Sequence, residues 1–122
     1  MSKSKNKKFE SDLLRGSLDL MVLSVLAEGS QYGYSLQKRL NAASLGKVNL
    51  QAGTLYPLLH RLETDKLIRS RWEDSTGRKR KWYDLTAKGK KRLNVQANQW
   101  RQYAQYMTDL ISGVTNQPKT SS

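Results

Sequence analysis

The sequence predicts a mainly α-helical protein with one small β-hairpin and a long helix toward its C-terminal end. Three observations support this fold class. Apolar residues recur at helical spacing in three segments before residue 66, two alternating segments follow, and a regular apolar stripe then runs to Val114. At 122 residues the chain can form one such domain with an appendage.

The first two predicted helices are separated by a short break. Leucine, methionine and valine side chains recur every three or four residues over roughly residues 12–28, and Gly29 ends this pattern. We expect Ser30 to be the N-cap of the second helix, so that Gly29-Ser30-Gln31 forms a tight turn. The second helix should run to Ala43, before the break at Ser44-Leu45-Gly46.

The third helix is predicted after a short strand at Val48 to Leu50. Leucines at positions 55, 58, 59 and 62 form one apolar stripe, which ends near Lys66. Pro57 would break the interior of a helix but is tolerated in the first turn, where backbone N–H groups lack intrahelical partners. The helix is therefore expected to begin near Gly53 or Thr54.

A β-hairpin and a final long helix complete the chain. Ile68 to Glu73 and Arg80 to Leu85 alternate in polarity on either side of Asp74-Ser75-Thr76-Gly77, which predicts a hairpin. Thr86 is expected to cap the last helix. Its apolar residues follow a heptad spacing over three heptads: Leu93, Ala97, Trp100, Ala104, Met107, Ile111 and Val114.

This heptad stripe predicts a dimer, because the preceding helices and hairpin already account for a compact core. The alternative is that the last helix folds back on its own domain. The sequence thus divides into a disordered basic tail at 1–11, a domain of three helices and a hairpin at 12–86, a dimerisation helix at 87–115 and a disordered tail at 116–122. The tail lysines, at positions 3, 5, 7 and 8, either contact phosphate or only add solubility.

The charge of the chain favours a polyanionic partner. There are 22 Lys and Arg residues against 10 Asp and Glu, giving a net charge of +12. The excess is local, because ten of the basic residues lie between Arg69 and Arg92, beside only three acidic ones. Charge alone does not separate DNA from RNA or an anionic membrane, so these partners remain alternatives.

Other functional classes are disfavoured by what the sequence lacks. Without cysteine there is no disulfide, thiolate zinc site or cysteine nucleophile, and His60 is the only histidine. We find no glycine-rich phosphate loop and no nucleophile with its base, so neither an enzyme nor a metal or cofactor is expected. The longest apolar run is too short for a membrane span, which predicts a cytoplasmic protein.

The third helix followed by a cationic hairpin is the order of elements with which a winged helix contacts DNA. Thr54, Tyr56 and Arg61 lie off the leucine stripe and can reach phosphates or base edges. The run Arg78-Lys79-Arg80-Lys81 would repel itself without a polyanion or solvent to screen it, so a phosphate track explains it best. The alternative is a solvated surface with no ligand. Among the aromatic residues, we expect Tyr32 to contact phosphate, and Tyr34, Trp72 and Tyr83 to lie in the core or at its rim.

Three motifs together resemble one protein family. They are Tyr32-Gly33-Tyr34, the stretch from Gly53 to Glu63 and the stretch from Arg80 to Gly89. The resemblance is to the PadR family of bacterial transcription regulators, and the single long last helix resembles its short subfamily. It implies a winged helix-turn-helix homodimer, usually a repressor. The third helix would enter the major groove of double-stranded DNA, and the hairpin, or wing, would reach the neighbouring backbone or minor groove.

The resemblance also implies contact residues. From the helix-turn-helix these are Tyr32, Lys38, Gly53, Thr54, Tyr56 and His60, and from the wing Thr76, Gly77, Arg78 and Lys79. We add Arg61 and Arg80 from their charge and position. A two-fold symmetric reader of this kind would bind a pseudo-palindromic operator with half-sites about one helical turn apart. The sequence departs from the family pattern at Ser35, Gln51-Ala52 and Lys66, so the operator sequence does not carry over.

Trp100 suggests a ligand site. Ala97 and Ala104 lie one turn away on either side, which would leave a cavity beside the indole in a dimer. Some PadR relatives bind flat aromatic compounds between such tryptophans, so the resemblance implies a small aromatic effector. The alternative is that Trp100 only fills the interface. A ligand-sensing multidrug-binding dimer, in which this pocket dominates, is the rival to a DNA-binding regulator.

Overall fold

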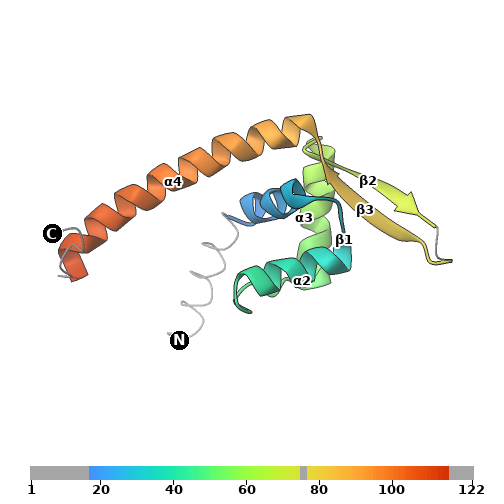
Figure 1. The fold of residues 1–122 in the computed structure, drawn as a ribbon, viewed down its shortest axis with the longest axis horizontal. Helices are drawn as coiled ribbons and strands as arrows, with labels where there is room; N and C mark the ends of the chain where they lie inside the picture. The colour runs from blue at the N-terminus through green and yellow to red at the C-terminus, as the bar shows by residue number, and fades with distance from the viewer. Residues whose placement is uncertain (1–16, 75–76, 116–122) are drawn as a thin grey trace.

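A computed structural model describes residues 17–74 and 77–115. It confirms the mainly α-helical fold with a winged helix-turn-helix and a long last helix (Figure 1). The predicted residues 12–16 of the first helix lie outside this range, and residues 17–28 are helical. The remaining elements, in chain order, are β1 (Gln31–Tyr32), α2 (Gly33–Ala43), α3 (Ala52–Thr64), β2 (Ile68–Glu73), β3 (Arg80–Leu85) and α4 (Ala87–Thr115).

The core lies between the first helix, α2, α3 and one face of the sheet. Every leucine predicted on the α3 stripe is buried, together with residues of the first helix, α2 and both wing strands. Fully burying one such side chain contributes roughly 1.5–3 kcal/mol. The side chains with no exposed surface are Val22, Leu23, Leu36, Leu55, Leu59 and Leu62.

The start of α2 differs from the prediction. Ser30 is not the N-cap, because its hydroxyl is hydrogen-bonded to the Asp84 carboxylate of β3. Gln31–Tyr32 is not part of a tight turn but forms β1, which pairs antiparallel with β3. Tyr32 is the N-cap residue, and its N–H donates to the Ser35 hydroxyl at 3.1 Å.

The predicted strand at Val48 to Leu50 is absent. The alternating burial of this segment is real, since Val48 and Leu50 are buried and Asn49 is exposed. Its polar backbone atoms bond to side chains instead of a strand: the Val48 N–H donates to Ser44 Oγ at 2.7 Å, and the Leu50 carbonyl accepts from Gln37 Nε2 at 2.6 Å. The third place in the sheet is taken by β1, giving the order β1-β3-β2.

Helix α3 begins earlier than predicted. Its first residue is Ala52, so Pro57 lies in the second turn and not in the first. Proline has no N–H, and the Gly53 carbonyl four residues earlier therefore receives no helical hydrogen bond from it. Gly53 is exposed, which leaves this oxygen accessible to water or a ligand.

The wing has the predicted antiparallel pairing. Ile68 pairs with Leu85 and Glu73 with Arg80, and of the residues between the strands, 75 and 76 lie outside the described part of the chain. The wing is tied to the body at Asp84, which accepts hydrogen bonds from Ser30 and from Arg71 Nε. The hydrogen bond from Ser30 lowers the pKa of Asp84, and Arg71 lowers it further.

Helix α4 begins as predicted. The Thr86 hydroxyl accepts a hydrogen bond from the Gly89 N–H at 2.9 Å and lies 2.7 Å from the Lys66 carbonyl oxygen. A Cβ on Gly89 would lie 2.0 Å from the Leu67 carbonyl oxygen, so only glycine lets the first turn of α4 pack here. Leu93 packs against the core.

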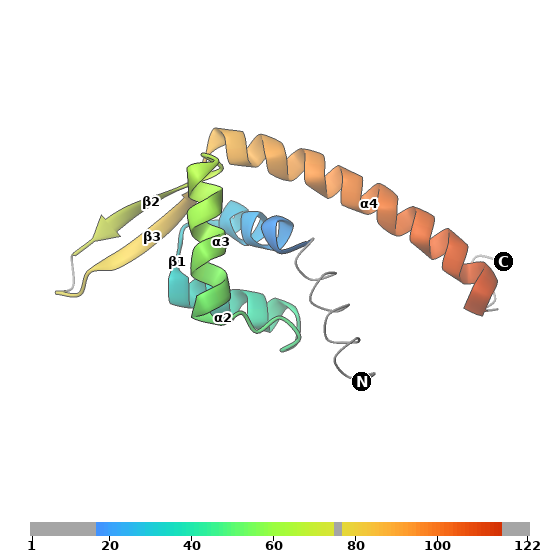
Figure 2. The same cartoon turned by 180° about the vertical axis from the view of Figure 1, so that it is seen from behind.

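Beyond this first part, α4 leaves the body of the protein. Figures 1 and 2 show its second half projecting past the other described elements. Among the described residues, no helix has the length and apolar character needed to cross a membrane.

Lys66 closes α3 in a strained conformation. The Leu67 N–H donates to the Leu62 carbonyl and the Lys66 N–H to that of Glu63, which is a Schellman motif with Lys66 at the position that glycine usually occupies. Lys66 has a φ of 63°, in the left-handed region.

Replacing Lys66 by glycine is therefore expected to stabilise the protein. Relief of the left-handed strain, about 1–2 kcal/mol, exceeds the entropic cost of glycine, leaving a net gain of about 0.5–1 kcal/mol. Urea unfolding of the two proteins should show a higher midpoint for Lys66→Gly at unchanged slope. Lys66→Ala is the control, because it removes the charge but keeps the Cβ, and it should leave stability near that of the parent. Equal stabilisation by both variants would contradict the explanation.

Candidate nucleic-acid interface

The exposed face of α3 carries the predicted reading residues. Because the leucine stripe faces the core, Gly53, Thr54, Tyr56 and His60 lie on the outside of the helix, and all are exposed. The first turn of a helix also has backbone N–H groups without intrahelical acceptors and the positive end of the helix dipole. This end of α3 can therefore receive phosphate oxygens and the edges of bases.

Tyr56 is held in place by the start of α2. A Cβ on Gly33 would lie 2.2 Å from the Tyr56 hydroxyl oxygen, so the phenol ring rests directly on the glycine. The ring remains 45% exposed. The Tyr-Gly-Tyr motif and the motif from Gly53 to Glu63 thus meet through one contact between residues 23 positions apart.

The wing presents its cations at the tip. Gly77 has a φ of +78°, a conformation that favours glycine, and Arg78 and Lys79 after it are exposed. Thr76 lies outside the described residues. Figure 1 shows the wing extending from the junction of α3 and α4 away from the helices.

Tyr32 and Arg80 form part of a stack across the outer face of the sheet. The Arg80 guanidinium lies 4.8 Å from the centre of the Tyr32 ring, and Tyr32 meets Trp82 edge to face at 5.2 Å. Arg71 covers Trp82 from the other side at 5.7 Å. This stack joins β1, β3 and β2, so Tyr32 and Arg80 help to set the angle of the wing as well as being available to phosphate.

Arg61 is placed away from the other predicted contacts. Its guanidinium forms a two-pronged ion pair with Asp19 of the first helix, at 2.6 and 3.1 Å, and this bond raises its pKa. The side of α3 that carries Arg61 faces the first helix and α4, because Arg61 shares a pocket with Gln96 and Trp100. Sequence spacing does not reveal this partner, since Asp19 lies 42 residues earlier.

Two aromatic residues line the space between the start of α2, α3 and the wing, and Lys38 of α2 lies over one of them. The Lys38 ammonium is 5.3 Å from the centre of the Tyr34 ring. Tyr34 and Trp72, which the sequence placed in the core or at its rim, are 58% and 66% exposed, whereas Tyr83 is buried as expected. Both exposed rings line a cleft of about 440 Å³ between the start of α2, α3 and the wing.

The comparison with known proteins agrees with this geometry. Residues 22–95 match the profile of the family described as Transcriptional regulator PadR-like family. This chain belongs to that family.

Solved PadR structures share the fold over most of the chain. A PadR family transcriptional regulator from Eggerthella lenta is 33% identical, covers 90% of this chain and 95% of its own, and superposes with a TM-score of 0.77. For a PadR-like transcriptional regulator from Bacillus cereus these values are 31%, 82%, 96% and 0.73. An uncharacterized protein from Lysinibacillus sphaericus is 30% identical over 105 residues, which are 85% of this chain and 96% of the relative.

Membership in the PadR family identifies the chain as a DNA-binding transcription regulator and not an enzyme, as the sequence predicted. It also gives meaning to one departure from the family pattern. Ser35, where PadR proteins often have glutamate, occupies the third position of α2 and accepts the hydrogen bond from the Tyr32 N–H. A glutamate at this position of a capping box performs the same task, so the exchange preserves the start of α2.

Proposed function

We propose that this PadR-family chain is a homodimeric repressor that binds a pseudo-palindromic operator in the cytoplasm. One observation carries the DNA-binding part: Tyr56 on the exposed face of α3 and Lys79 at the cationic wing tip line one cleft. In this arrangement Gly53, Thr54, Tyr56 and His60 would read the major groove. Lys38, Gly77, Arg78 and Lys79 would bind phosphates, with Tyr32 and Arg80 beside them and Thr76 next to Gly77 in the sequence.

The exposed face of α4 supports the dimer. Of the heptad residues, Trp100 is 52% exposed, Ile111 46% and Val114 85%. Tyr103, Tyr106 and Leu110, which do not belong to the heptad, are also exposed on this half of the helix, so the apolar face is wider than the sequence suggested. An apolar face of this kind marks an interaction surface, and a second α4 is the partner with matching chemistry.

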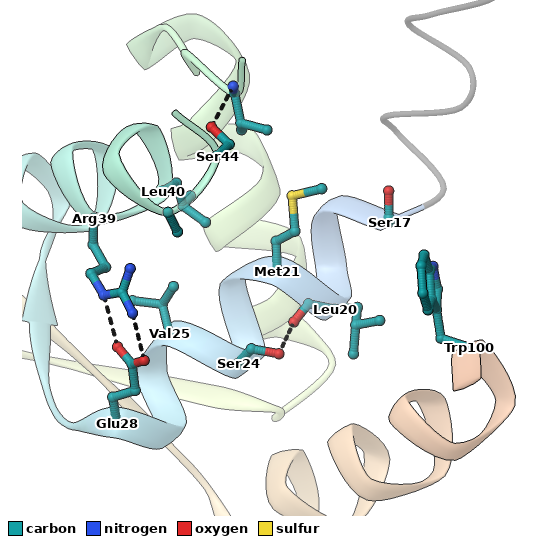
Figure 3. Close-up of a pocket in the computed structure, with 12 residues that line it drawn as sticks. Ser17, Leu20, Met21, Ser24, Val25, Glu28, Arg39, Leu40, Ser44 and Trp100 are labelled. Carbon is teal, nitrogen blue, oxygen red and sulfur yellow. Dashed lines mark hydrogen bonds and ion pairs between the residues drawn. The ribbon is translucent and has the colours of Figure 1, made fainter. Parts of the chain in front are cut away.

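A groove next to Trp100 supports an effector site. It has a volume of about 460 Å³ and is lined mainly by apolar residues of the first helix and α2, with Trp100 of α4 facing them (Figure 3). The ion pair between Arg39 and Glu28, at 2.8 Å, lies at its edge. A flat aromatic compound beside Trp100 would lie close to the proposed dimerisation helix. Its binding would relieve repression by changing the distance between the DNA-binding domains of the two subunits.

Selection of bound sequences from random duplex DNA tests the function. We expect a pseudo-palindrome whose half-sites are about 10 base pairs apart, bound at least ~10³-fold more tightly than random duplex. A preference far below this ratio would contradict a sequence-specific regulator. With the selected site in hand, a panel of planar aromatic compounds should include some that both quench Trp fluorescence and release the DNA. If none does so, Trp100 serves only the interface.

A further inference from the structure

The cleft between α2, α3 and the wing combines aromatic and cationic side chains. Tyr34 and Trp72 line it and are each more than half exposed, and Tyr56, which rests on Gly33, lines it as well. The lining also includes Lys79, Arg80 and Lys81 of the wing. None of the sequence motifs assigned a ligand to Tyr34 or Trp72.

The charges in this cleft define what it can hold. The Lys81 ammonium lies 5.8 Å from the centres of both the Trp72 and Tyr83 rings, and Lys38 lies over the Tyr34 ring. No acidic residue is among those that line the described cleft. A second copy of this chain, with a net charge of +12, is a poor occupant, and so is an uncharged apolar molecule, which would desolvate the lysines without compensating them.

The position of the cleft selects among anionic occupants. It shares Tyr56 with the exposed face of α3 and Lys79 with the wing tip, so it joins the two surfaces proposed to contact DNA. The first two residues of α2, Gly33 and Tyr34, also line it, and the positive end of the α2 dipole favours phosphate there. Its volume lies in the range of small-ligand sites, which suits one nucleotide and not a whole duplex.

We propose that this cleft holds one nucleotide of the DNA strand that passes between α3 and the wing. The sugar and the base edge lie against Trp72 and Tyr34, and the flanking phosphates bind Lys79 and Lys81. This inference rests on the proposed function and adds to it a contact that is apolar. Trp72 would then contribute to affinity without neutralising a phosphate, so its contact releases no counterions from the DNA. The cations of the wing differ, because each contact to a phosphate releases counterions.

Salt titration separates this role from a purely electrostatic one. In fluorescence anisotropy with the full chain and its selected operator, Trp72→Ala should weaken binding roughly tenfold, as expected for losing one aromatic contact to a nucleotide. The slope of log K against log salt should not change, because the variant removes no cation. Trp72→Phe keeps an aromatic ring and should bind within about threefold of the parent. In Trp72→Phe the quenching of Trp fluorescence by operator should nevertheless be smaller, because the variant has no indole at position 72 to be quenched.

A matched control excludes a general effect of removing exposed apolar surface. Leu45 is 91% exposed on the loop after α2 and does not line the cleft, so Leu45→Ala should bind operator like the parent. The proposal is overturned if Trp72→Ala binds normally, or if its loss of affinity comes with a lower salt slope. Failure of the parent protein to prefer any operator would instead refute the proposed function, and thermal unfolding of each variant identifies a folding defect.

Discussion

Replacing Arg78 and Lys79 together by alanine should weaken binding to every duplex, operator or random, by about 60-fold at 0.1 M salt. Each phosphate contact contributes about 0.9 to the slope of log K against log salt, so two lost contacts lower the slope by about 1.8. Because both side chains are exposed at the wing tip, the folded domain should keep its stability. Titrations of operator and random duplex at four salt concentrations measure both quantities.

The control for this result lies on α3. Thr54 is exposed on the first turn and carries no charge, so Thr54→Ala should leave the salt slope unchanged and reduce the preference for operator over random duplex. If the wing variant instead loses operator binding alone, or Thr54→Ala weakens both duplexes equally, the roles assigned to helix and wing are reversed.

Replacing Met107 by glutamate should convert the proposed dimer to monomers and abolish tight operator binding. Met107 lies on the apolar face of α4 and is 37% exposed in the single chain. In a dimer the substitution would bury two carboxylates without partners, each costing several kcal/mol, which weakens association by at least about 100-fold. Light scattering at micromolar concentration should report the mass of one chain. Operator affinity should fall because a monomer has one DNA-binding domain and contacts only one half-site.

Gln102→Glu is the matched control for the dimer. It adds the same charge to an exposed polar position of α4 on the side opposite the heptad stripe, and should leave both mass and operator binding unchanged. A dimeric Met107→Glu protein would show that this face of α4 is not the interface. Monomeric Gln102→Glu would show that charge alone, regardless of position, separates the chains.

The fold connects the wing to α4, the helix proposed to form the dimer. Helix α4 starts against the base of the wing, where Thr86 binds the Lys66 carbonyl, and its second half leaves the body. A shift of α4 in the dimer would therefore be transmitted to β3 and to the end of α3, which meet at this junction. This connection would link the proposed effector site near Trp100 to the proposed DNA-binding face.

The order of helices, hairpin and final helix was predictable from the sequence because it depends on local periodicity. The leucine stripe of α3, the alternation in the wing and the Thr86 cap each act over a few neighbouring residues. The secondary-structure predictions were wrong where the local pattern of a short segment fits more than one conformation. Val48 to Leu50 alternates like a strand but has side-chain partners, and Gln31–Tyr32 is too short to be recognised as β1 without β3 beside it.

The sequence by itself determined that this protein has three helices, a basic hairpin and a long last helix with an apolar stripe, since helical and strand periods and charge clusters are properties of neighbouring residues. Only the tertiary structure decided that Arg61 is paired with Asp19, that Tyr56 rests on Gly33, and that Tyr34 and Trp72 are exposed in one cleft. These facts join residues 23 to 42 positions apart, and no local pattern encodes such contacts. They depend on how the helices and the sheet pack around the shared core.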